Sequence, residues 1–364
     1  MDLSDQERLF RQRRKWIWGC TCGCLVLMLA AAAVIIGVYM WFARALPVPA
    51  AEAFLTPEAG AFLFVRIAPD DPMMVEVPVR LAMEPSVQGR VPTKDDQPMQ
   101  VDAEQMRAAV VGVAPMQLIV LGTVAEDEPQ VRWGLAVSIT RLGRLLDAVL
   151  GRLVAKMGPA GSEEYKGGTI VTMADEEGAF GFRTNTYMVA EEKALLRAWL
   201  DGIQADAERG GDPEAEPAPL PAGMDPQLLE AHDSLDRNSP VRFACLNAHG
   251  EVADLLSKLP GKEVAARLRQ AGMAGPGVLC VSGQLQSMNS RDASLTLRIS
   301  CADDRTAAGI EAALTELIDD EERTPHLRDP LVLRQDGGVV ELTGRIENLA
   351  DRVAELVNAI ERDE

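Results

Sequence analysis

The chain has 364 residues, of which 47% are hydrophobic and 25% are charged, a composition typical of globular proteins and unlike that of disordered or fibrous chains. Its formal net charge is −19. Because so acidic a chain repels phosphate backbones, we expect no nucleic-acid partner. The length predicts roughly two or three domains.

The first distinctive segment, residues 16–43, contains 28 residues and no charged side chain. As a helix it would be about 42 Å long, enough to cross a hydrocarbon core of about 30 Å. We therefore predict one transmembrane helix that anchors the chain as a single-pass membrane protein. Aromatic side chains at both ends are typical of membrane interfaces; they are Trp16, Trp18, Trp41 and Phe42.

Basic side chains precede this segment, in a tail of residues 1–15. The positive-inside rule places such a tail in the cytoplasm and the following chain outside it. We therefore expect a protein of the cell membrane whose bulk is periplasmic or extracellular, with residues 44–58 as a juxtamembrane linker. A signal peptide cleaved after Ala45 is the alternative, but its apolar region would span only about 7–15 residues. The basic residues that set the orientation are Arg11, Arg13, Arg14 and Lys15.

A first exterior unit is expected at residues 59–205. Apolar residues at every second position predict strands, and spacings of three and four predict helices. In chain order we expect a strand at 61–68, a helix at 102–113, strands at 117–124 and 131–139, an amphipathic helix at 142–157, strands at 168–173 and 179–190, and a helix with the inner face Leu195, Leu196, Trp199, Leu200 and Ile203.

An acidic, proline-rich stretch at residues 206–226 has the composition of a linker. A second unit, residues 227–364, repeats the order of elements of the first. It contains a strand at 241–247, helical material at 251–271, strands at 278–286 and 293–301, a helix at 307–318, a hairpin around Asp336-Gly337-Gly338 and a closing helix at 346–360.

Both units follow the order β, α, ββ, α, ββ, α. We therefore predict the α+β class: one transmembrane helix followed by a duplicated α+β unit, with antiparallel sheets covered by amphipathic helices on one face. Residues 69–101 have no counterpart in the second unit. Their alternating apolar residues predict an additional edge strand that tolerates Pro78. The alternating residues are Val75, Val77, Val79 and Leu81.

After the apolar segment the chain contains the stretches FLTPEAGAFLFVRI, EEYKGGTIVTM and TYMVAEEKALLRAWLDGI. Together with the basic tail and the membrane segment, they resemble an uncharacterised bacterial family of membrane-anchored extracytoplasmic proteins, classed as a domain of unknown function. The resemblance covers residues 16–203. It implies a protein of the bacterial envelope and carries no active site to transfer.

Residues 336–360 show a second, local resemblance. A Gly-x-Val-x-Leu-x-Gly strand before a helix is similar to a BON-type module. That resemblance implies an association with envelope or phospholipid surfaces, so lipid is included among the expected partners.

Sequence motifs of known catalytic classes are missing from the chain: it has no Walker loop, dinucleotide fingerprint, nucleophile elbow or HExxH. The histidines have no metal-ligand spacing. We therefore expect no catalytic residue, no metal, no cofactor and no enzymatic activity. The histidines are His232, His249 and His326.

Three cysteines, Cys245, Cys280 and Cys301, fall in predicted exterior strands. Cys280 and Cys301 lie on the two arms of one hairpin and could form a disulfide in an oxidising compartment. Alternatively, the thiols are buried as small apolar side chains.

Taken together, these features predict a non-enzymatic, single-pass, membrane-anchored binding or structural protein. Its exterior part would contact another protein of the envelope. A membrane-tethered carrier of lipid or a small ligand is the first alternative. An enzyme with an unrecognised site is the second.

Overall fold

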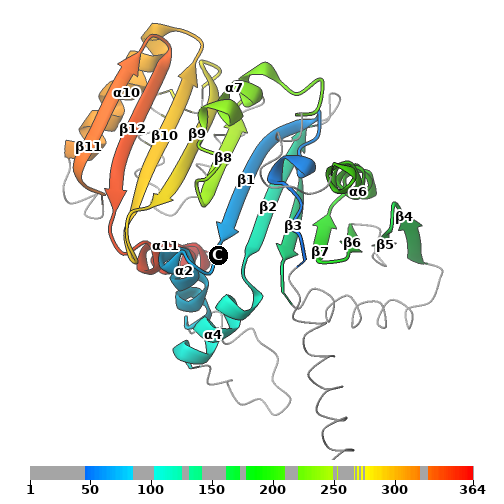
Figure 1. The fold of residues 1–364 in the computed structure, drawn as a ribbon. Helices are drawn as coiled ribbons and strands as arrows, with labels where there is room; N and C mark the ends of the chain where they lie inside the picture. The colour runs from blue at the N-terminus through cyan, green and yellow to red at the C-terminus, as the bar shows by residue number, and fades with distance from the viewer. Residues whose placement is uncertain are drawn as a thin grey trace, which may run out of the picture. The chain divides into compact units, whose positions relative to one another are not determined.

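Two strands far apart in the chain, β1 (Ala59–Ile67) and β8 (Val241–Leu246), pair antiparallel at the centre of a twelve-stranded sheet (Figure 1). Leu63 lies opposite Phe243 in this pair. The sheet is thus continuous between the two regions that the sequence analysis separates. This computed structural model describes residues 46–84, 102–124, 131–141, 161–172, 178–209, 220–248, 252, 266, 269, 272–273, 275–319 and 327–363.

We call strands β1 to β7 the first half of the sheet and strands β8 to β12 the second half. Outward from β1 the order is β2, β3, β7, β6, β5, β4, and outward from β8 it is β9, β10, β12, β11. The remaining strands are β2 (Met116–Val124), β3 (Val131–Ile139), β4 (Ser162–Tyr165), β5 (Gly168–Thr172), β6 (Ala179–Arg183), β7 (Thr186–Ala190), β9 (Val278–Ser287), β10 (Ala293–Cys301), β11 (Leu327–Asp336) and β12 (Val339–Ile346).

The predicted fold class, a duplicated α+β unit with antiparallel sheets covered by helices on one face, is wrong for the described part of the chain. The described part of the chain is one sheet-rich unit in which β1 and β8, the first strands of the two expected units, bond to each other. Unpaired strand edges expose backbone donors and acceptors. The pairing of β1 with β8 satisfies the hydrogen-bonding groups on the edges of both strands.

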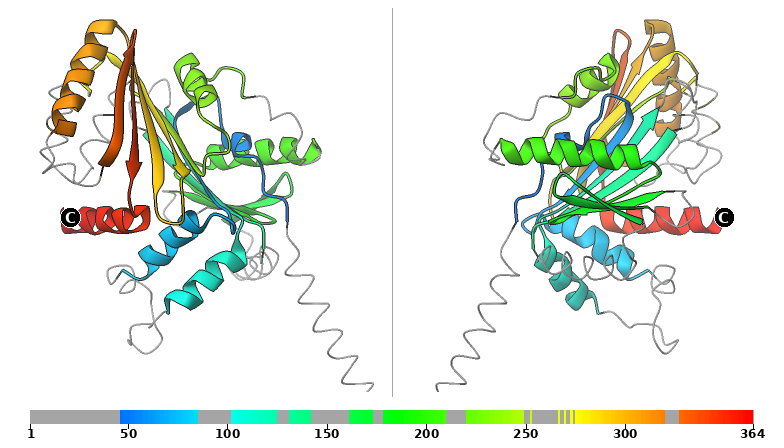
Figure 2. Two further views of the ribbon diagram at one scale, coloured as in Figure 1. Left: turned by 60° about the vertical axis from the view of Figure 1, so that its left-hand side comes forward. Right: turned by 90° about the vertical axis from the view of Figure 1, so that its right-hand side faces the viewer.

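Helices cover both faces of the sheet, which also corrects the expected single covered face. A short 3-10 helix, η1 (Ala51–Phe54), and the helices α6 (Lys193–Glu208) and α7 (Pro226–Ser234) lie on one face. The helix α10 (Asp304–Asp319) covers the opposite face of the second half (Figure 2). Three further helices gather at one end of the sheet (Figure 1): α2 (Pro72–Ala82), α4 (Ala103–Val113) and α11 (Leu349–Asp363).

The largest core lies between α6 and the sheet. Trp199 of α6 is fully buried and donates its Nε1–H to the carbonyl oxygen of Phe54 at 2.7 Å. The rings of Phe54 and Trp199 meet edge to face, with centroids 5.8 Å apart. The predicted inner face of this helix is confirmed, since Leu195, Leu196, Trp199, Leu200 and Ile203 are all buried.

The edge strand expected within residues 69–101 is wrong, because Pro72–Ala82 form the helix α2. Asp71 is the N-cap, and its Oδ1 accepts a hydrogen bond from the backbone N–H of Met74 at 3.2 Å. Pro72 at the first helical position suits a helix start. These start signals prevail over the alternating valines, even though Pro78 lies inside the helix.

Most of the other described elements confirm the predicted secondary structure with small shifts at their ends. The strand expected at 179–190 is instead the two strands β6 and β7, and the strand β4 and the helix α7 were not predicted. The strand β10 has the predicted bounds, and the hairpin of β11 and β12 turns at Gly337, whose φ is +55°. Of the helices that the structure describes, none combines the length and apolar character needed to cross a membrane. The predicted membrane segment 16–43, its flanking residues and the predicted helix at 142–157 lie outside the described residues, as does most of 251–271. The flanking residues are Arg11, Arg13, Arg14, Lys15, Trp16, Trp18, Trp41 and Phe42.

Candidate functional site

Two adjoining grooves open at the end of the sheet where α2, the turn between β9 and β10, and the start of α11 meet. The first groove has a volume of about 450 Å³ and is lined by Arg66, Asp70 and Asp71, among others. The second has a volume of about 480 Å³ and lies between α2 and α11. Pro72 and Ser290 line both grooves. Charged and amide side chains give the site a polar character.

The β9–β10 turn is fixed by the buried carboxylate of Asp292. This group accepts hydrogen bonds from Nδ2 of Asn289 at 2.8 Å, from the backbone N–H of Asn348 at 3.1 Å, and from Arg345. The contacts with Asn289 and Arg345 hold the pKa of Asp292 at about 2. The carboxylate is therefore ionised at neutral pH and joins the turn to the start of α11.

The same turn is braced by Asn289 and by a contact to α2. The side-chain oxygen of Asn289 accepts from the backbone N–H groups of Arg291 and Asp292 at 2.8 and 2.9 Å. The hydroxyl of Ser287 donates to Oδ2 of Asp71, the N-cap of α2. The walls of the first groove are thus set by side chains from β9, the turn and α2.

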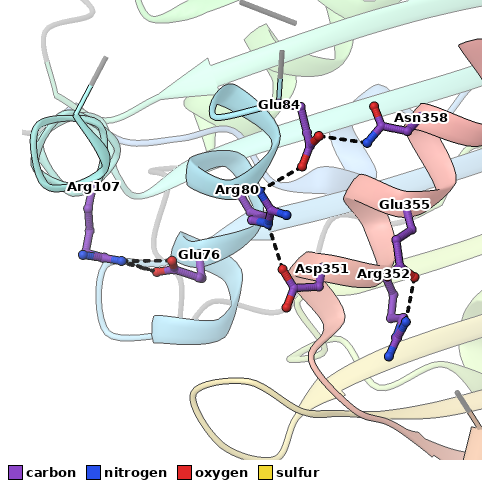
Figure 3. Close-up of polar contacts among 8 residues, drawn as sticks. All are labelled: Glu76, Arg80, Glu84, Arg107, Asp351, Arg352, Glu355 and Asn358. Atoms are coloured by element: carbon purple, nitrogen blue, oxygen red, sulfur yellow. Dashed lines mark hydrogen bonds and ion pairs between the residues drawn. The ribbon is translucent and has the colours of Figure 1, made fainter. Parts of the chain in front are cut away.

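In the second groove, an ion pair joins α2 to α11 (Figure 3). Nε of Arg80 donates to Oδ1 of Asp351 at 2.8 Å, and Nη1 of Arg80 lies 2.9 Å from Oε1 of Glu84. Glu84 also accepts from Nδ2 of Asn358 at 2.8 Å. The hydrogen bond with Asp351 raises the pKa of Arg80 above its ordinary value. One arginine therefore links two helices that are more than 250 residues apart in the chain.

Three charged side chains of the groove walls, Glu76, Arg80 and Asp351, form ion pairs with other described residues. The carboxylate of Asp71 has no ion pair among them, but it accepts hydrogen bonds as the N-cap of α2. Arg107 of α4 forms a forked pair with Glu76 of α2, with contacts of 2.8 and 2.9 Å (Figure 3). By contrast, the side chains of Arg66, Asp70 and Arg291 are exposed and make no hydrogen bond or ion pair with other described residues. These three groups are the ones free to meet a partner.

A second polar cluster, formed by Glu52, His232 and Arg242, is buried. Oε1 of Glu52 lies 3.5 Å from Nε2 of His232 and 3.4 Å from Nη1 of Arg242. The guanidinium of Arg242 lies 5.2 Å from the ring centroid of Phe64, and the His232 ring meets Phe62 edge to face. These phenylalanines belong to the large core, so we assign the cluster a structural role.

The charges in this cluster stabilise one another against the cost of burial. Burial alone raises the pKa of Glu52, but the contacts with His232 and Arg242 outweigh it and lower the pKa to about 2. Burial lowers the pKa of Arg242, an effect that Glu52 opposes. The ionised pair is therefore retained in an apolar environment.

Cys280 and Cys301, the two cysteines that could form a disulfide, are not brought together, and both are buried, in agreement with the prediction that they are small apolar side chains of the core. Cys280 lies opposite Ser300, and Cys301 lies opposite Val278. Cys280 belongs to the core under α7 and Cys301 to the core under α10, on opposite faces of the sheet. Among the described residues, Cys245, Cys280 and Cys301 form no disulfide, and Sγ of Cys245 donates to the carbonyl oxygen of Leu246 at 3.3 Å. Burial raises the pKa of Cys280 to about 12.

Among the histidines, His232 is buried as described, whereas residues 249 and 326 lie outside the described part of the chain. Within the described ranges no group of three His, Cys, Asp or Glu side chains could hold a metal ion. Sequence reasoning missed both grooves and the buried cluster. Two local sequence patterns lie beside the grooves, the Asp71-Pro72 helix start and the turn from Asn289 to Asp292. Neither pattern indicates that α2, the β9–β10 turn and α11 meet in the folded chain.

Comparison of the chain with protein-family models, with curated proteins and with solved structures finds no match. No activity or partner can therefore be transferred from a relative. The family resemblances seen in the sequence stay predictions.

Proposed function

We propose that this chain is a non-catalytic binding protein that holds a protein partner in the two grooves beside α2. The observation that carries the proposal is the pair of exposed arginines, Arg66 and Arg291, which line the grooves and make no hydrogen bond or ion pair with other described residues. Arginine presents a planar fork of donors that matches a carboxylate. A partner segment that carries carboxylates fits this arrangement.

The contacts that hold the groove walls in place support binding. The turn is fixed by Asp292, and α2 is fixed to α11 by Arg80. A site that is ordered before binding loses less conformational entropy when the partner docks. Because the whole chain is acidic, recognition of carboxylates here depends on local contacts and not on long-range attraction. Asp70 adds a position that favours a basic group on the same partner.

The proposed place of action is a membrane surface. The apolar composition of residues 16–43 supports attachment to the bilayer, and the basic tail before them supports an extracytoplasmic position for the sheet. The partner would then be another protein of the same envelope. This part of the proposal rests on the sequence alone.

The test is photocrosslinking in native membranes. A photoreactive amino acid at Ser290, which lines both grooves, should capture a partner from the full-length chain. The double variant Arg66→Ala/Arg291→Ala should lose that product. The matched control is Arg334→Ala, which removes an exposed arginine of β11. A missing product in the wild type, or an unchanged product in the double variant, would refute the proposal.

A further inference from the structure

One face of the first half carries apolar side chains that are open to solvent. Trp133, Leu135 and Val189 are 41%, 39% and 40% exposed. Leu135 and Val189 are cross-strand neighbours on β3 and β7. Their chain neighbours Ala136 and Met188 lie in the core under α6, so the exposed residues lie on the opposite face. A cluster of this kind in the middle of a sheet indicates a surface that another element covers.

The strand register identifies the corresponding residues of the second half. From the central pair Leu63–Phe243, one row of cross-strand neighbours runs outward through each half. Leu135 thereby corresponds to Leu297. The first row is Leu63, Val120, Leu135, Val189 and Phe180, and the second is Phe243, Gly283, Leu297, Leu342 and Leu333.

In the second half, α10 covers this face. Leu342 is 6% exposed, and Ile299 and Val340 in the adjacent row are 1% and 0% exposed. Ile299 and Val340 pack with α10 in one core. The corresponding pair in the first half, Val137 and Tyr187, is only half-buried. The first half therefore has the same apolar rows, and no helix among its described residues covers them as α10 covers those of the second half.

We infer that this uncovered face binds residues 142–157 of the same chain, in the place that α10 takes in the second half. Those residues lie outside the described part, and the argument comes from their sequence and from the path of the chain. Residue 142 follows Ile139, the end of β3, by the same number of residues as Asp304 follows Cys301, the end of β10. The chain also leaves from and returns to strands of the first half.

The apolar spacing of the segment matches that of α10. Both contain three apolar residues at spacings of three and four, which gives one apolar stripe on a helix. An apolar stripe of this kind could pack against the exposed apolar rows of β3 and β7. The matching residues are Ala307, Ile310 and Leu314 of α10 and Leu146, Val149 and Leu153 of the segment.

The test places a photoreactive amino acid at Leu135 in the full-length chain. Mass spectrometry of the product should locate the crosslink within residues 142–157, in a species of monomer mass. The same group at Met288, which is 55% exposed but lies beside the first groove, should give no such crosslink.

A pair of variants checks the role of the stripe. Val149→Asp/Leu153→Asp should abolish the Leu135 crosslink, whereas Arg152→Asp, which lies off the stripe, should keep it. A crosslink to a second copy, to another protein or to lipid would overturn the inference, as would no crosslink at all. The inference is independent of the proposed function, and it leaves the grooves as the surface for a partner.

Discussion

Nη1 of Arg242 lies 3.4 Å from Oε1 of Glu52 inside the core. Arg242 belongs to β8, the first strand of the second half, and Glu52 belongs to η1, which leads into β1. The contact therefore joins η1, which precedes the first strand of the first half, to the first strand of the second half, beside the central strand pair β1–β8. Unfolding of the two halves should be coupled through it.

Replacing Glu52 with Gln should lower the free energy of unfolding at pH 7 by about 3 kcal/mol, because it leaves Arg242 buried without its ionic partner. The pKa of Glu52 is lowered from 4.5 to about 2. Because the pKa of Glu52 is lower in the folded than in the unfolded chain, the carboxylate stabilises the fold at every pH above the unfolded pKa of 4.5. That stabilisation is lost as the pH falls from 4.5 towards 2. Denaturant unfolding should thus show a difference in the free energy of unfolding between wild type and variant that becomes smaller as the pH falls from 4.5 towards 2. Glu58→Gln, at an exposed site, should show no such difference.

Removing the carboxylate of Asp292 should loosen the groove walls without unfolding the sheet. Asp292→Ala deletes the acceptor of the Asn348 backbone N–H and the partner of Arg345. We expect faster hydrogen exchange at the β9–β10 turn and at the start of α11, measured by mass spectrometry. Peptides from β1 and β2 should exchange at the wild-type rate. Unchanged protection at Asn348 and Leu349 would contradict this account of the turn.

The sequence predicted well those features that depend on neighbours in the chain. Alternation gave the bounds of β10, and the apolar stripe gave the inner face of α6. It failed at α2, where alternating valines and Pro78 suggested a strand while Asp71 and Pro72 begin a helix.

The pairing of β1 with β8 could not be predicted, because backbone hydrogen bonds between strands depend little on side-chain identity. The grooves were out of reach for a related reason. They join residues that are brought together only when α2, the β9–β10 turn and α11 meet, so no local pattern contains them.

The thiol of Cys280 should be inert in the folded protein. Burial raises its pKa from 9.0 to about 12, which lowers the thiolate fraction near neutral pH by about a thousandfold. Differential alkylation with iodoacetamide, read by mass spectrometry, should therefore label Cys280 only after denaturation. Rapid labelling of the native chain, or a disulfide-linked peptide containing Cys280 and Cys301, would contradict the placement of these residues on opposite faces.

Gly202 should be essential for the close packing of α6 against η1. A Cβ atom at this position would lie 1.9 Å from the backbone oxygen of Ala53, and a backbone atom cannot move aside as a side chain can. Gly202→Ala should therefore cost about 1–3 kcal/mol of stability, because the helix must shift away from Phe54. Gly112 of α4 has nothing within 4 Å of such a Cβ, and Gly112→Ala should be neutral or stabilise by up to about 1 kcal/mol. Thermal unfolding of the two variants measures the difference. Equal effects would mean that α6 does not approach η1 this closely, and the hydrogen bond from Trp199 to Phe54 would then lose its support.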